Sequence, residues 1–168
     1  MDQELAARLA AVKLVALDCD GVLTDGGLWY GPNGEAMKRF DVKDGHAMVL
    51  ARLAGLPLAI VTARDSEIVR TRMRELGVWN VSTGDRDKAR AFAAVLARAG
   101  LEAKDALYMG DDVNDLPPLR MAGVAACPSD AAPEVRAECA LVTATPGGRG
   151  AVRELLELVL AARGAWSP

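Results

Sequence analysis

The residues best suited to chemistry in this 168-residue chain are two aspartates separated by a single position. Asp18 and Asp20 follow the apolar run 12–17, which is long enough for one buried strand and too short to span a membrane. Alternate side chains of an extended chain point to the same side, so we expect both carboxylates to emerge together where the strand ends. Two anions that close repel each other unless a cation or a shared proton relieves them. The pair therefore predicts a functional site at the carboxyl end of a central strand.

Polar residues also follow two later apolar runs. Thr62 ends one of these runs, and Asp111 closely follows another. The apolar runs alternate with amphipathic stretches of helical period, which predicts an α/β fold with a doubly wound, mostly parallel, Rossmann-like sheet covered by helices on both faces. Ligands of such sheets bind beyond the carboxyl ends of the strands. We therefore expect Asp18, Asp20, Thr62 and Asp111 to meet at one edge of the sheet.

Several carboxylates converging on one edge favour a hard divalent cation with oxygen ligands, for which Mg²⁺ is the usual choice. The expected ligands are Asp18, Asp111 and the backbone carbonyl of Asp20. Such an ion can hold a phosphate oxygen and screen a carboxylate from the negative charge of a phosphate. The sequence therefore predicts a magnesium site that serves phosphate chemistry.

A lysine in an unfavourable position points to the same chemistry. We expect Asp85 to cap a helix whose first turn contains Lys88. A cation in the first turn opposes the helix dipole, so an anionic ligand explains Lys88 better than helix stability does. Together the residue types fit covalent phosphoryl transfer: Asp18 attacks phosphorus, Asp20 protonates the leaving oxygen and then activates water, and Thr62 and Lys88 bind phosphoryl oxygens.

Length, charge and composition exclude several other classes of protein. A chain of this length forms one domain, and we expect that domain to span 1–168. The formal net charge of −3, with no basic stripe, argues against nucleic-acid binding. We find no membrane-spanning run and no signal peptide, and the odd cysteine count lacks metal-type spacing, so we expect a cytoplasmic protein with reduced thiols.

Further elements are expected along the chain. Helices are predicted at 2–11, from Asp44 to about 53, from 65 or 66 to 77, from 85 to 99 and at 151–162, with short helical pieces near 116–121 and 132–137. Strands are predicted at 79–81, 106–109, 123–126 and 140–143.

Four segments in this order resemble the motifs of the haloacid dehalogenase superfamily. They are DCDGVLTDGG from Asp18, then Thr62, then Lys88, and finally GDDVNDLP around Asp111. The match extends over nearly the whole chain. The resemblance implies that Asp18 is a nucleophile, that Asp20 is the acid/base, that Thr62 and Lys88 bind phosphate, and that Asp111 binds Mg²⁺.

Most such phosphatases insert a cap domain, for which this chain has no room. The gap between the first two motifs holds a β-hairpin insertion at about 26–41, with turn chemistry around 31–34, and one helix. We expect this hairpin to expose apolar side chains, namely Leu28, Trp29, Tyr30, Met37 and Phe40. A site without a cap must accept a macromolecule or be closed by another subunit, and we expect hairpin-mediated assembly into a homo-oligomer.

Longer segments resemble the family of 3-deoxy-D-manno-octulosonate 8-phosphate phosphatases. They are DGVLTDGGLWYGPNGEAMKRFDVKDG, VTARDSEIVRTR and TPGGRGAVRE. The resemblance implies a Mg²⁺-dependent homotetramer that hydrolyses a small acidic sugar phosphate in lipopolysaccharide synthesis, without nucleic acid or membrane partners. Its substrate-contacting positions fall on Asp20, Lys88, Asp41, Val42, Lys43, Asp44, Gly45, Arg64 and Arg72, with Arg72 reaching a neighbouring subunit's site.

Three alternatives stay open. A related phosphatase of a nine-carbon, sialic-acid-like sugar 9-phosphate resembles the chain almost as well, although Arg64 together with Glu75 favours the eight-carbon substrate. A phospho-accepting receiver also uses clustered acids with Thr and Lys, yet receivers carry an adjacent acidic pair, whereas Asp18 and Asp20 are two positions apart. A non-catalytic oligomerisation module is the third alternative, and the intact motifs argue against it.

Overall fold

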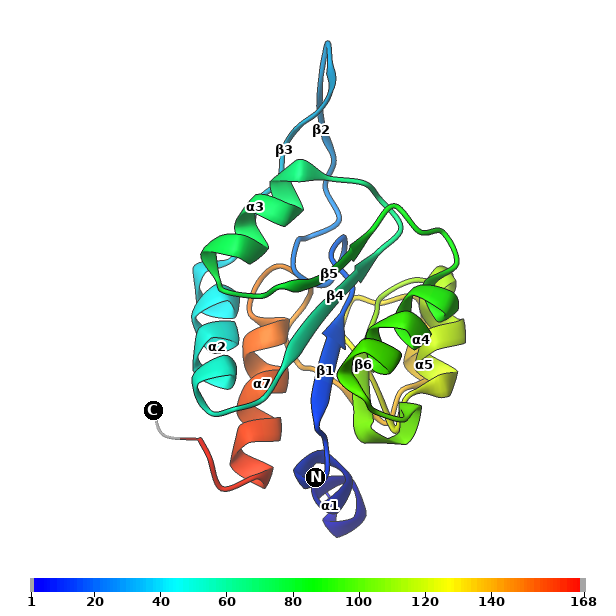
Figure 1. Ribbon diagram of the computed structural model, residues 1–168. Helices are drawn as coiled ribbons and strands as arrows, with labels where there is room; N and C mark the ends of the chain where they lie inside the picture. Colours follow the sequence, from blue (N-terminus) through cyan, green and yellow to red (C-terminus); the bar gives the residue numbers. More distant parts are fainter. Residues whose placement is uncertain (1, 167–168) are drawn as a thin grey trace.

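The computed structural model describes residues 2–166 and contains a six-stranded parallel sheet in the order β5-β4-β1-β6-β7-β8 (Figure 1). This arrangement confirms the predicted doubly wound α/β fold. The expected domain range of 1–168 includes residues 1, 167 and 168, which lie outside the described part of the chain. The strands are β1 Leu14–Leu17, β4 Leu58–Thr62, β5 Asn80–Thr83, β6 Ala106–Met109, β7 Val124–Cys127 and β8 Leu141–Val142.

Helices cover both faces of this sheet and enclose two apolar clusters. No helix within residues 2–166 has the length and apolar character that crossing a membrane requires. On one face lie α1 Gln3–Ala10, α2 Val42–Leu53, α3 Glu67–Glu75 and α7 Ala151–Ala162; on the other lie α4 Lys88–Ala99, α5 Leu116–Met121 and α6 Pro133–Glu138. Short 3₁₀ turns, η1 Ala103–Asp105 and η2 Val113–Asp115, precede β6 and α5.

Strand β1 lies at the centre and sends its side chains alternately to the two clusters. Val15 and Leu17 pack on the α2/α7 side, whereas Leu14 and Ala16 pack on the α4 side. Burial on both faces explains the continuous apolar run.

Strand β1 ends at Leu17, and the backbone then turns, with the carbonyl of Cys19 accepting hydrogen bonds from the three N–H groups of residues 22–24. The expectation of an extended chain through Asp20 is therefore wrong.

The predicted hairpin is present and projects from the carboxyl end of the sheet (Figure 1). It consists of β2 Trp29–Gly31 and β3 Gly34–Met37, and Gly34 supplies the positive φ of +106° that the turn requires. Phe40 was expected to be exposed; instead it is half-buried and packs against the core, since the chain has already returned to the sheet there. Between β1 and β4, the described chain holds only this hairpin and α2, with no cap domain.

Two helices begin at other residues than expected. Helix α2 begins at Val42, two residues before the expected start, with the Asp41 side chain accepting a hydrogen bond from the Lys43 N–H at 2.7 Å. Helix α4 is capped by Asp87, not by Asp85, so Lys88 is its first residue. In both cases two aspartates lie close together in the sequence, Asp41 with Asp44 and Asp85 with Asp87. Their spacing alone does not show which of the two caps the helix.

A glycine-rich loop before α7 packs directly on the turn that follows β1. The Gly148 N–H donates to the Val22 carbonyl at 2.9 Å. A Cβ atom on Gly147 would overlap the carbonyl of Gly21, and one on Gly148 would overlap the backbone of Thr24. Only glycine permits this approach of two backbones, and the loop therefore holds the turn in place.

Asp44 joins the start of α2 to the start of α7. Its side chain is buried and accepts hydrogen bonds from the N–H groups of Gly150 at 3.2 Å and Arg153 at 2.7 Å. These N–H groups lie in the first turn of α7, where no helical carbonyl can receive them. Asp44 therefore acts as an N-terminal cap supplied from another helix.

We expect Asp44→Ala to lower the free energy of unfolding by about 1–3 kcal/mol, because two N–H groups at the start of α7 lose their acceptor. Urea unfolding followed by circular dichroism would measure the change. Glu134→Ala, at an exposed position of α6, is the matched control and should have little effect. Equal stability of the Asp44 and Glu134 variants would contradict this account of Asp44.

Candidate active site

A pocket of about 580 Å³ lies at the carboxyl end of the sheet. Its position agrees with the rule that ligands of parallel sheets bind at this edge. Its walls come from the ends of β1, β4 and β6, the start of α4 and the start of the hairpin segment. The pocket brings together all the residues predicted from their chemistry, namely Asp18, Asp20, Thr62, Lys88 and Asp111.

Lys88 occupies the centre of a buried ion triad. Its Nζ lies 2.8 Å from Asp18 Oδ2 and 2.7 Å from Asp115 Oδ1, and all three side chains are almost completely buried. Burial alone would lower the pKa of Lys88, but the charges of Asp18 and Asp115 raise it above its ordinary value. The lysine is therefore a permanent cation beside Asp18, in spite of the helix dipole that opposes it.

Asp115 is the residue that orients Lys88. It is fully buried and also accepts hydrogen bonds from the Tyr108 hydroxyl at 2.8 Å and from the Asp111 N–H at 3.2 Å. Donors therefore surround both of its oxygens. We infer that Asp115 supports the site from behind, whereas Asp18 and Asp111 keep oxygens that face the pocket.

The acidic residues of the site fit a divalent cation. Carboxylate oxygens of Asp18, Asp111 and Asp115 lie within 4.8 Å of one another, with one lysine to balance three acids. Burial, together with the charge of Asp115, raises the pKa of Asp18 well above its usual value and that of Asp111 to about 7. A Cβ atom on Gly21 would overlap the Asp111 carboxylate, so the chain following Asp20 passes directly against it. The unbalanced negative charge and the oxygen donors suit Mg²⁺.

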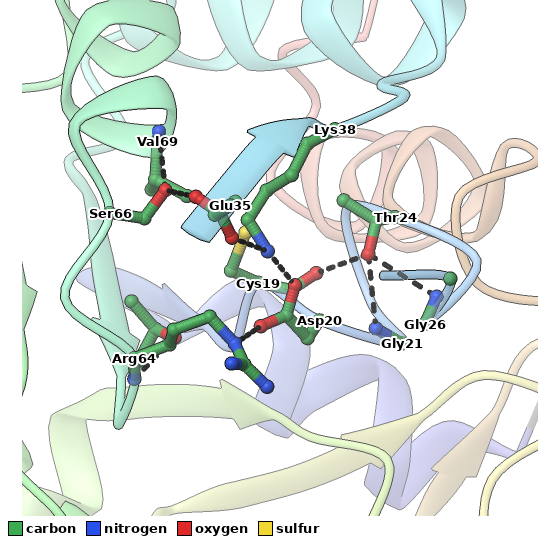
Figure 2. Close-up of polar contacts among 12 residues, drawn as sticks. Cys19, Asp20, Gly21, Thr24, Gly26, Glu35, Lys38, Arg64, Ser66 and Val69 are labelled. Atoms are coloured by element: carbon green, nitrogen blue, oxygen red, sulfur yellow. Dashed lines mark hydrogen bonds and ion pairs between the residues drawn. The ribbon is translucent and has the colours of Figure 1, made fainter. Parts of the chain in front are cut away.

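Asp20 pairs with two cations that are not part of this triad, Lys38 and Arg64 (Figure 2). Lys38 contacts Asp20 Oδ1, and the Nε of Arg64 donates to Asp20 Oδ2 at 3.2 Å. Arg64 also donates to the Tyr30 hydroxyl at 3.0 Å. Different cations thus balance the negative charges of Asp18 and Asp20. The sequence did not predict the contact of Lys38, because a hairpin side chain gives no local signal of its distant partner.

Several residues of the predicted substrate-binding set do not line this pocket. Within one chain, the segment 41–45 and Arg72 lie outside it. Asp44 and Gly45 are buried, and Arg72 packs against Gly45 and pairs with Glu75 at 3.2 Å. The structure thus brings Arg64 into the pocket, and of the segment 41–45 it leaves only Val42 and Lys43 exposed, outside the pocket.

Arg86 is a pocket residue that sequence reasoning missed. It lines the pocket two positions before Lys88, and its side chain makes no ion pair with any residue from 2 to 166. Lys88 and Arg64, the other pocket cations, are both paired with acids. Arg86 is therefore available to an anionic ligand, and the only signal in the sequence was its closeness to Lys88.

Comparison with known proteins places these features in a family context. Residues 34–123 match the family described as haloacid dehalogenase-like hydrolase. A relative from Escherichia coli, 3-deoxy-D-manno-octulosonate 8-phosphate phosphatase KdsC, is 35% identical over 96% of this chain and 86% of its own length.

Two solved structures are similar along almost their whole length. The 3-deoxy-D-manno-octulosonate 8-phosphate phosphatase from Moraxella catarrhalis, in complex with a magnesium ion, a phosphate ion and a KDO molecule, superposes with a TM-score of 0.94 at 35% identity, covering 98% of this chain and 94% of its own. The cobalt-bound deoxy-D-mannose-octulosonate 8-phosphate phosphatase from Haemophilus influenzae gives a TM-score of 0.91 at 38% identity, with coverages of 94% and 92%.

The raised pKa of Asp111, about 7, predicts how pH changes the response to Mg²⁺. Without the ion, the folded chain holds this proton more tightly than the unfolded chain, so this contribution to stability falls as pH rises from about 4 to about 7. A carboxyl group must lose its proton to bind a metal. Mg²⁺ should therefore raise the melting temperature more at about pH 8 than at about pH 5.5.

Differential scanning fluorimetry with and without MgCl₂ would measure this difference. The isosteric Asp111→Asn substitution removes the titrating ligand and should greatly reduce the Mg²⁺-dependent rise at both pH values. A rise of equal size at both pH values in the unmodified chain would contradict the assignment of Asp111 as the titrating group.

Proposed function

This chain belongs to the haloacid dehalogenase-like hydrolase family, and from that premise we propose that it is a Mg²⁺-dependent phosphatase of 3-deoxy-D-manno-octulosonate 8-phosphate. The observation that carries the proposal is the buried contact of Asp18 with Lys88, in a pocket shared with Asp111 and Asp20. The similarity to phosphatases of this substrate, including the magnesium, phosphate and KDO complex, supports the choice of substrate.

In the proposed reaction, an Asp18 oxygen attacks phosphorus while Lys88 binds the phosphoryl oxygens and the Thr62 hydroxyl donates to another of them. Asp20 gives its proton to the oxygen of the leaving sugar, and the phosphoryl group remains on Asp18 as an acyl phosphate. Asp20 then accepts a proton from the water that attacks this phosphorus, which releases phosphate and restores Asp18. Asp18, Asp111 and the Asp20 carbonyl would hold Mg²⁺, which neutralises negative charge between the carboxylate and the phosphate when bound.

The cations of the pocket suit an acidic sugar phosphate. Arg64 is partly exposed, and its planar guanidinium matches a carboxylate in two hydrogen bonds. Arg86, which lacks an acidic partner among residues 2–166, offers a second cation at the wall of the pocket. We infer that these two arginines bind the anionic groups of the substrate while Lys88 remains at phosphorus. The nine-carbon analogue carries the same groups and is the comparison substrate in the test below.

We further propose that the site is completed by neighbouring subunits of a homotetramer. The hairpin exposes Trp29 and Tyr30 by 56% and 64%, and Met37 by 58%. A two-stranded ribbon with this much apolar surface is not stable in water by itself. Arg72 and residues 41–43, which lie outside the pocket of their own chain and are not buried, are the residues that a neighbour would bring to it.

We expect the purified chain to release phosphate from the eight-carbon sugar phosphate in Mg²⁺, more efficiently than from the nine-carbon 9-phosphate, and to lose activity in EDTA. Asp18→Asn should lower kcat by on the order of a thousandfold or more, as the loss of a nucleophile does. Malachite-green detection of phosphate would measure both. Asp105→Asn, at the opposite end of the sheet, is the matched control. A stable phosphoprotein without turnover would instead favour a receiver, and full activity of Asp18→Asn would contradict the proposal.

The assembly has its own test. Trp29→Glu places a charge on the exposed hairpin and should convert tetramers to smaller species, which light scattering coupled to size exclusion would detect. It should also raise KM for the sugar phosphate, because the neighbour's residues leave the pocket. Trp79→Glu, at another exposed tryptophan at the amino end of β5, should change neither. A fully active monomeric wild-type chain would refute the shared site.

A further inference from the structure

We propose that Lys38, supplied by the hairpin, is a positioning residue that holds the Asp20 carboxylate in its catalytic orientation. The proposal rests on the proposed function, since it requires that Asp20 is the acid/base of the phosphatase reaction. It gives the hairpin a role in the chemistry of Asp20 in addition to its role in assembly. Lys38 lies directly after β3, eighteen positions beyond Asp20, on a segment that the motifs of the active site do not include.

The first support is the burial of the Lys38 side chain, of which only 1% is exposed. Its ammonium group contacts Asp20 Oδ1 and lies 3.0 Å from Glu35 Oε1, and Figure 2 shows it between these two carboxylates. A buried ion pair is a weak source of stability, because desolvation of the charges offsets their attraction. The cost of burying this lysine is better explained by the carboxylate that it fixes.

The second support is that Lys38 is itself held from behind. The other oxygen of Glu35 accepts a hydrogen bond from the Ser66 hydroxyl, and Ser66 caps helix α3 by accepting from the Val69 N–H at 3.3 Å. A continuous chain of polar contacts therefore runs from the start of α3, through the hairpin, to Asp20 (Figure 2). A side chain fixed at both ends limits the rotamers of the carboxylate it contacts.

The third support is the contrast between the two cations on Asp20. Arg64 contacts the other carboxylate oxygen, but its side chain is 37% exposed and is shared with Tyr30. Arg64 can therefore turn to a substrate anion, whereas the Lys38 side chain is almost completely buried. When Arg64 turns away, Lys38 remains the contact that keeps Asp20 directed at the leaving oxygen.

A double-mutant cycle tests the proposal. Proton transfer by a positioned side chain contributes about a hundredfold to ten-thousandfold to a rate, and loss of the orientation of Asp20 should remove part of this contribution. Lys38→Met, close to isosteric and uncharged, should therefore lower kcat by about tenfold to a hundredfold, with KM changed less than about twofold. In an Asp20→Asn background the same substitution should have almost no further effect, because two residues that act as a unit are not additive. Both the sugar phosphate and p-nitrophenyl phosphate serve as substrates.

Additive losses in the cycle, or an unchanged kcat for Lys38→Met, would overturn the positioning role. Lys104→Met, which removes the lysine of an exposed ion pair with Glu102, is the matched control. If Lys38→Met does not fold, Glu35→Gln removes the rear support instead and should lower kcat by a smaller factor, again only when Asp20 is present. Absence of hydrolysis of either substrate by the wild-type chain would refute the proposed function itself, which distinguishes the two failures.

Discussion

The contact between one buried ammonium and two carboxylates is the interaction on which the rest of the site depends. Lys88 begins α4, Asp18 follows β1, and Asp115 follows β6, so three separate segments must meet for any of these charges to be tolerated. Removing one member would leave an uncompensated buried charge. The triad still carries more negative than positive charge, and this imbalance is what makes the neighbouring Asp111 carboxylate receptive to a divalent cation.

Much of this arrangement could be predicted because it follows from local pattern and parallel topology. Apolar runs located the central strands, and the rule that parallel strands share one functional edge predicted that Asp18, Thr62 and Asp111 lie together. The helix starts were less predictable: Asp85 and Asp87 are both good caps, and only tertiary packing selects Asp87. The same holds for Asp44, which was expected to open a helix and bind substrate; in the structure it lies inside α2 and caps α7, more than a hundred positions away.

Contacts across long separations account for what sequence reasoning missed. Nothing in the spacing of Lys38 connects it to Asp20, since the hairpin turn and the path after β1 decide where it lies. The hairpin consequently has two chemically different surfaces. One surface exposes Trp29 and Met37, which are paired across the two strands, whereas the other carries Glu35 and Lys38 toward Asp20. In a chain whose described part has no cap domain, this ribbon brings a buried cation, Lys38, to Asp20, the proposed acid/base.

The loop before α7 has a consequence for the biosynthesis of the protein. The proposed catalytic and metal-binding side chains all lie at or before Asp111, yet the turn after β1 is held by the backbone of Gly147 and Gly148. A nascent chain that has emerged only as far as α6 contains all of these side chains but lacks Gly147 and Gly148, which hold the turn. Long-range closure of this kind slows folding relative to local contacts. The turn that follows the proposed nucleophile, Asp18, is thus fixed only after residues 147 and 148 have been synthesised.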